Sequence, residues 1–89
     1  MPRIILPSDG RYDWLTESKG YLHDVDVELD DGSIVKINFY DPARLAQDVE
    51  AELRRGTAGL SWKRLIVVES VTLAAMQSAV DAVAPEFFD

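Results

Sequence analysis

Apolar and polar residues alternate from Tyr21 to Tyr40, less cleanly after Asp30-Asp31-Gly32 than before it. This period-two pattern on both sides of a turn sequence predicts a β-hairpin with one apolar face and one polar face. The predicted apolar face carries Val25, Val27, Leu29, Val35, Ile37 and Phe39.

The length of the turn decides which residues face each other across the hairpin. A two-residue loop would set Val27 opposite Lys36 and mix apolar with charged side chains on both faces. A three-residue loop sets Val27 opposite Val35 and places Gly32 at the left-handed position that such a turn requires. Because a slip of one residue moves every side chain to the other face, we expect the three-residue loop. It also pairs Asp26 with Lys36.

A helix is predicted directly after the hairpin. Asp41 can cap its first turn, Pro42 suits its first position, and Gly56 ends it. The apolar stripe at helical spacing comprises Leu45, Ala46, Val49 and Leu53. On the solvent-exposed side of this helix, we expect ion pairs between Arg44 and Asp48 and between Glu50 and Arg54.

A short apolar strand at residues 64–68 and a second helix complete the pattern. This helix starts near Ser70 or Thr72, either of which could cap it, and stops before Pro85. Its expected buried stripe comprises Leu73, Met76, Val80 and Val83. Residues 1–20 are read as an irregular segment with a possible edge strand from Ile4 to Leu6.

These elements predict a single α+β domain over residues 1–89, in the order ββαβα. The hairpin has only one apolar face, so both helices are expected to cover that face of a small mixed sheet with three to four strands. The predicted architecture is a two-layer sandwich whose opposite sheet face is open to solvent or to a partner.

The charge and composition exclude several classes of function. The net charge of −7 opposes binding to nucleic acid or to anionic membranes, because that affinity depends on neutralising phosphates with cations. The chain has no cysteine, which suits a cytoplasmic protein. It also has no run of about 18 apolar residues that could span a bilayer. The simplest interpretation of the charge is solubility, and the alternative is a basic partner.

Residues suited to catalysis are few. His23 is the only histidine, and the hairpin register places it near Phe39 at the end of the apolar face, so we interpret it as partly buried and structural. Hydrolase triads and the common zinc sites therefore lack components. The acidic run before the turn fails as a calcium loop, because Asp31 stands where glycine is needed and Ile37 where glutamate is needed. No cofactor and no metal site are expected.

The most prominent candidate site is a surface on the polar face of the hairpin. Its residues are Asp24, Asp26, Glu28, Lys36, Asn38 and Tyr40. This set is either an ordinary solvated sheet face or an acidic docking surface, edged by an aromatic ring, for a basic protein. A second candidate site consists of aromatic residues, some of which could serve either a homodimer contact or the core. They are Tyr12, Trp14, Trp62, Phe87 and Phe88.

Over residues 22–83 the chain resembles a family of small bacterial proteins of unknown function. The resemblance rests on NFYDPARLAQDVEAEL and LIVVESVTLAAMQSAV, above all on the Phe39–Pro42 segment between strand and helix. It implies a bacterial source and assigns no catalytic residues. Small acidic immunity proteins, which neutralise toxins, are similar in size and charge only.

The sequence therefore predicts a non-enzymatic protein-interaction or regulatory module, with another protein or a second copy of the chain as its partner. One alternative is a small-ligand-binding domain or minor enzyme using His23, Tyr40 and nearby carboxylates. Another is an immunity-type inhibitor of a basic toxin.

Overall fold

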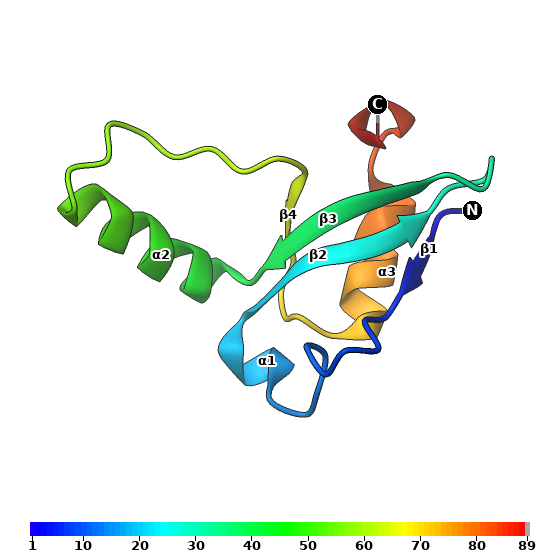
Figure 1. Ribbon diagram of the computed structural model, residues 1–89, viewed down its shortest axis with the longest axis horizontal. Coiled ribbons are helices and arrows are strands. Elements are labelled where there is room, and N and C mark those ends of the chain that lie inside the picture. The colour runs from blue at the N-terminus through cyan, green and yellow to red at the C-terminus, as the bar shows by residue number, and fades with distance from the viewer. Residues whose placement is uncertain (89) are drawn as a thin grey trace.

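The computed structural model describes residues 1–88 and shows a small α+β fold (Figure 1). Its elements are β1 (Arg3–Ile5), α1 (Thr16–Lys19), β2 (Tyr21–Glu28), β3 (Ile34–Tyr40), α2 (Pro42–Arg54), β4 (Leu65–Val67), α3 (Leu73–Ala82) and the 3₁₀ turn η1 (Pro85–Phe88). The strands form one mixed sheet in the order β1-β2-β3-β4, with β3 and β4 parallel and the other pairs antiparallel. The predicted fold class is confirmed, and the possible edge strand near Ile4 is β1.

The hairpin has the register that its alternation predicts. Val27 lies opposite Val35 and Asp26 opposite Lys36. The amide of Leu29 donates to the carbonyl of Ser33 at 2.8 Å, which closes a three-residue turn. Gly32 has φ +87°, a left-handed conformation that glycine adopts without steric cost.

One interruption in β2 changes the far end of the hairpin. The pairing shifts between Leu22 and Val25, and Asp24 in this interval has φ +54°. Two residues of β2 therefore oppose one residue of β3, which is a β-bulge. Leu22, and not His23, lies opposite Phe39. The predicted position of His23 is thus wrong, because the extra residue reverses the alternation on its side of the bulge.

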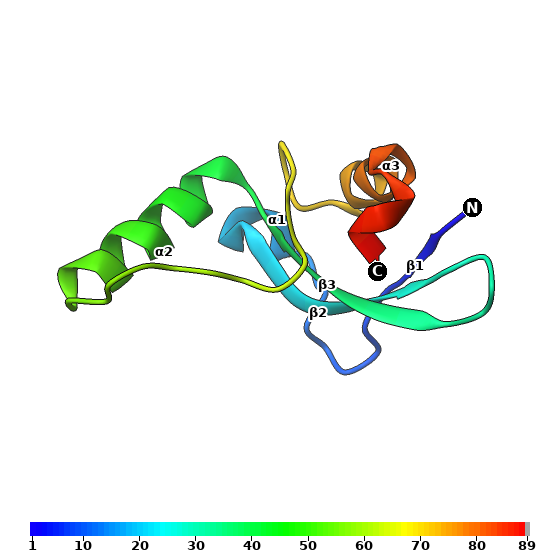
Figure 2. The same ribbon diagram turned by 90° about the horizontal axis from the view of Figure 1, so that it is seen from above.

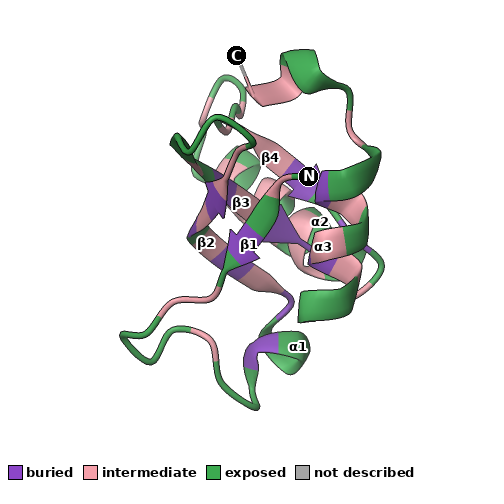
Figure 3. Ribbon diagram, turned by 90° about the vertical axis from the view of Figure 1, so that its right-hand side faces the viewer, coloured by how far each residue is buried: buried purple, intermediate pink, exposed green. Residues whose placement is uncertain are grey.

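The hydrophobic core lies between the apolar face of the sheet and α3 (Figure 3). Val25, Ile37 and Phe39 from the strands and Met76 from α3 have no exposed surface. α3 is also tied to β1, because Gln77 accepts the amide of Ile4 at 3.0 Å and donates to the carbonyl of Pro2 at 2.9 Å. The sheet face predicted to be covered is therefore covered by α3.

The predicted caps and stripes are partly confirmed. Asp41 accepts the amide of Arg44 at 2.7 Å, and Thr72 accepts that of Ala75 at 3.2 Å. In α3 the predicted stripe is buried at Met76 and Val80, partly buried at Val83, and 40% exposed at Leu73.

α2 departs from the prediction that both helices cover the apolar face. It leaves the end of β3 and projects sideways from the sheet (Figures 1 and 2), and none of its residues is buried. Leu45 and Val49 are half-buried, and Leu53 is 52% exposed. The amphipathic pattern shows that one side of this helix is apolar, but it does not show what that side packs against.

Candidate functional site

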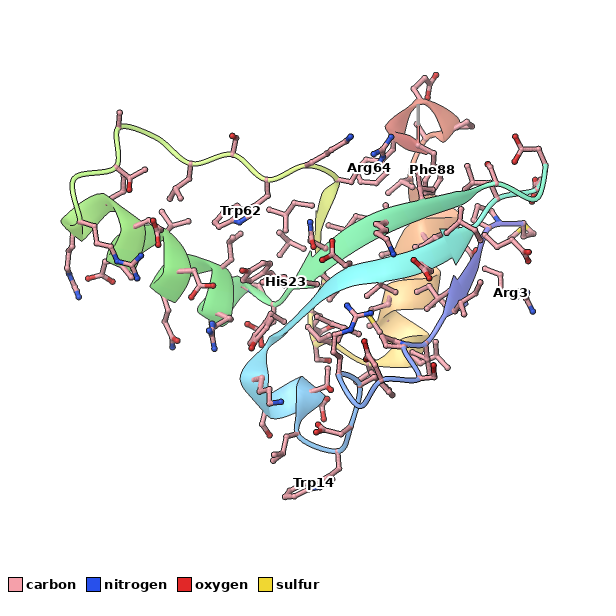
Figure 4. All side chains as sticks on the ribbon, in the orientation of Figure 1. Arg3, Trp14, His23, Trp62, Arg64 and Phe88 are labelled. Atoms are coloured by element: carbon pink, nitrogen blue, oxygen red, sulfur yellow. The ribbon has the colours of Figure 1, made fainter. Side chains whose placement is uncertain are left out.

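The predicted surface on the polar face is largely neutralised by ion pairs. Lys36 Nζ lies 2.7 Å from Asp26 Oδ1, as the register predicts, and Arg3 Nη2 lies 2.8 Å from Glu28 Oε1. Figure 4 labels Arg3 on β1, the strand next to β2, which carries Glu28. Exposed pairs of this kind contribute about 0.2–1 kcal/mol each to stability. Two of the three acids thus have a basic neighbour, and the face is mixed in charge.

The other predicted residues of this surface have local structural roles. Asn38 accepts the backbone amide of Asp24 at 3.0 Å and donates to the carbonyl of Lys63 at 3.0 Å. Its side chain therefore links the bulge in β2 to the segment just before β4. Asp24 is exposed at the bulge.

Tyr40 does not lie on an exposed surface, which corrects the sequence prediction. It is 2% exposed, because side chains of α2 and Trp62 cover it. Its hydroxyl donates to Asp48 Oδ2 at 2.9 Å and lies 2.9 Å from His23 Nε2. Because the phenolic proton goes to the carboxylate, the Nε2–H of His23 donates to the phenolic oxygen.

Arg44 and three aromatic rings complete this cluster. Arg44 Nε donates to Asp48 Oδ1 at 3.0 Å, and its guanidinium lies 4.5 Å from the centroid of the Tyr21 ring. The His23 ring is 4.9 Å from that of Tyr21, and the Trp62 ring is 5.6 Å from that of Tyr40. We call the set the Tyr40 cluster; its members are Tyr21, His23, Tyr40, Arg44, Asp48 and Trp62. Figure 4 shows His23 and Trp62 converging between the sheet and α2.

A cleft of about 390 Å³ opens beside the Tyr40 cluster. One wall consists of Asp48 and Glu52 from α2 and Arg55 directly after it, and the other includes Leu60 and Trp62. Glu52 and Arg55 are paired at 2.6 Å. This volume lies within the range of small-ligand sites. The sequence predicted neither the cleft nor the role of Trp62.

The environment of Tyr40 makes its hydroxyl a weaker acid than that of a tyrosine in water. Burial raises the pKa of Tyr40 from 10.0 to about 12, and the hydrogen bond to the Asp48 carboxylate adds to the effect. The phenol therefore stays protonated far above neutral pH and is not activated as a base or nucleophile. Its neutral form instead serves the hydrogen bonds that tie α2 to the end of the hairpin.

Unfolding at alkaline pH tests this arrangement. The folded pKa of about 12 exceeds the unfolded value near 10.0, so the contribution of Tyr40 is complete below pH 10 and is lost between pH 10 and 12. At about 1.4 kcal/mol per pKa unit the loss is at most about 3 kcal/mol. Chemical denaturation at pH 9 and pH 12 should show a smaller fall in unfolding free energy for Tyr40→Phe than for the native chain. Equal falls would contradict the assignment.

The predicted aromatic surface is divided among several environments. Tyr12, Phe87 and Phe88 pack against the core, and Trp62 joins the Tyr40 cluster. Trp14 alone is 85% exposed, and it points away from the sheet (Figure 4).

Among residues 1–88, no group of three or more histidine, aspartate or glutamate side chains is placed to hold a metal ion. Within the same residues, every helix is too short or too polar to cross a membrane. Comparisons with protein-family models, with curated proteins and with solved structures found no match. The resemblance to small bacterial proteins therefore stays a prediction.

Proposed function

We propose that this chain is a non-enzymatic protein-interaction module and that α2 is its binding element. The observation that carries the proposal is the partly uncovered apolar side of α2, on which Leu45 and Val49 are only half-buried. Leu53 is 52% exposed, no residue of the helix is buried, and the helix projects from the sheet (Figure 2). Amphipathic helices bind protein partners by laying such a side into an apolar groove, with anchors three or four residues apart along the helix.

The charges of α2 favour a partner that contributes apolar surface. Arg44 pairs with Asp48, and Arg54 pairs with Glu50, so these groups already have internal partners. The anchors that remain are Leu45, Val49 and Leu53. We expect the partner to present a groove with few charges, since interface cores are depleted of charged residues.

Site-specific photo-crosslinking in the native host tests the proposal. A benzophenone amino acid replaces Leu53 on the apolar side, and in a matched control it replaces Gln47, which is exposed on another side of α2. The expected result is a discrete protein adduct from position 53 and none from position 47. Absence of an adduct at 53, or the same adduct at both positions, would contradict the proposal. The mass of the adduct distinguishes a second copy of this chain from another protein.

The immunity-type hypothesis places the contact on the polar face instead. It is supported by the net charge of −7, and it is weakened by the ion pairs of Asp26 and Glu28. Replacing Asp24, Asp26 and Glu28 by lysine should leave binding through α2 nearly unchanged. A large loss of affinity, with a flatter salt dependence, would instead favour a basic partner on this face.

Small-ligand binding is the second candidate function, and the cleft beside Tyr40 favours it. The cleft combines the Trp62 ring with Asp48 and Arg55. Because Trp14 is exposed elsewhere, a Trp14→Phe variant leaves Trp62 as the fluorescent reporter. A saturable change of its emission with a metabolite mixture, lost on Tyr40→Ala, would support this function.

A further inference from the structure

A second cleft lies at the end of the molecule away from α2. Its volume is about 510 Å³. The N-terminus, the tip of the β2–β3 hairpin and the C-terminal turn gather at this end (Figures 1 and 3). The apolar floor of the cleft is formed by Leu29, Val80, Val83 and Phe88.

The rim of this cleft is acidic. Asp30 and Asp31 come from the hairpin turn, and Asp81 comes from the end of α3. None of the described lining residues is basic. Hydrogen bonds from Ser33 lower the pKa of Asp31 below its usual value, which keeps this carboxylate ionised. A concave apolar surface beside several negative charges attracts positively charged groups.

The protein already places one cation on this rim. The α-amino group of Met1 lies 2.5 Å from Asp30 Oδ1. Both partners are largely exposed, with side chains 80% and 73% accessible. Asp30 therefore already has a cationic partner, whereas Asp31 and Asp81 accept hydrogen bonds from the neutral residues Ser33 and Gln77.

We infer that this cleft binds a basic peptide segment of a protein partner, with one apolar side chain on the floor and flanking lysine or arginine side chains at the acidic rim. The volume falls in the range of ligand sites, and the charges are complementary. This site is separate from α2, so the inference goes beyond the proposed function and does not depend on it.

An NMR titration tests the inference with a defined probe. The ¹⁵N-labelled full chain is titrated with the peptide acetyl-Lys-Leu-Phe-Lys-amide. We expect saturable amide shifts at Leu29, Val80 and Val83, which weaken as salt is added. The peptide acetyl-Glu-Leu-Phe-Glu-amide should cause no such shifts. Absence of shifts at these residues, or shifts confined to α2, would overturn the inference.

Matched variants separate the rim from the overall charge. Asp31→Asn with Asp81→Asn removes two rim charges, and Glu17→Gln with Glu69→Gln removes two exposed charges elsewhere. The rim variant should bind the lysine peptide about 3- to 20-fold more weakly than the native chain, and the control should bind it nearly unchanged. Equal weakening in both variants would show attraction by net charge only and would overturn the inference.

Discussion

Replacing Ile37 by alanine is expected to lower the free energy of unfolding by about 2–5 kcal/mol, the range for removing a large aliphatic side chain from a packed core. Ile37 has no exposed surface and lies opposite Val25 beneath α3. A domain of this size has a total stability on the order of 5 kcal/mol. The variant should therefore be largely unfolded or close to it at 37 °C, as measured by urea denaturation followed by circular dichroism.

Ile34 provides the matched control for this experiment. It lies in the same strand but is 48% exposed. Ile34→Ala should cost less than about 1 kcal/mol, because little apolar area returns to water. Similar losses for the two variants would mean that the hairpin does not have the register described here.

Replacing Gly20 by alanine is the second substitution with a large expected effect, about 2–4 kcal/mol of lost stability. Gly20 has φ +80°, and an added Cβ would lie 2.7 Å from Asp41 Oδ2 and 2.8 Å from Arg44 Cβ. The left-handed backbone costs alanine about 1 kcal/mol, and the close approach adds about 1–3 kcal/mol. The Gly20 carbonyl also accepts the Asp41 amide at 2.8 Å. The substitution therefore strains the start of α2.

Gly56→Ala isolates the contribution of close packing. Gly56 has φ +88°, and an added Cβ would meet no atom within 4 Å. It should therefore cost only about 1 kcal/mol, which reflects the backbone conformation alone. Thermal unfolding of both variants measures the difference. Equal costs would show that Gly20 is not packed against the cap of α2.

The hairpin could be predicted in detail because its alternation and turn sequence constrain each other. Only one turn length puts Val27 opposite Val35 while giving Gly32 a left-handed position. The bulge at Asp24 was missed, although two polar residues, His23 and Asp24, separate Leu22 from Val25 where a strict alternation allows only one. The error at His23 follows from that single extra residue.

The position of Tyr40 illustrates the same limit for the candidate site. Its place in the alternation correctly assigns it to the face opposite Phe39, but that face is covered at this end by Asp48 and Arg44 from α2. The i,i+4 pair of those two residues was predictable, since it lies within one helix. Its contact with Tyr40 depends on how the helix leaves the sheet, which periodicity does not encode.

The two clefts depend on tertiary arrangement still more strongly. The 510 Å³ cleft is lined by Pro2, Leu29, Val80 and Phe88, among others. These residues lie far apart in the sequence, so no local sequence pattern predicts that they meet. Its acidic rim consists of turn and helix-end residues that a sequence shows only as solvated positions. Such sites can be recognised only from the tertiary structure, in which β1 and α3 lie beside the hairpin.

Native-state hydrogen exchange measured residue by residue tests most directly whether α2 projects from the core with its apolar side only partly covered. Because α2 buries no residue, we predict that its amides, including that of Leu53, exchange by local opening, about 100-fold or more faster than those of Ile37 and Phe39 in the core. Protection of the Leu53 amide equal to that of Ile37 would contradict the arrangement, since it would mean that the helix is packed as firmly as the sheet.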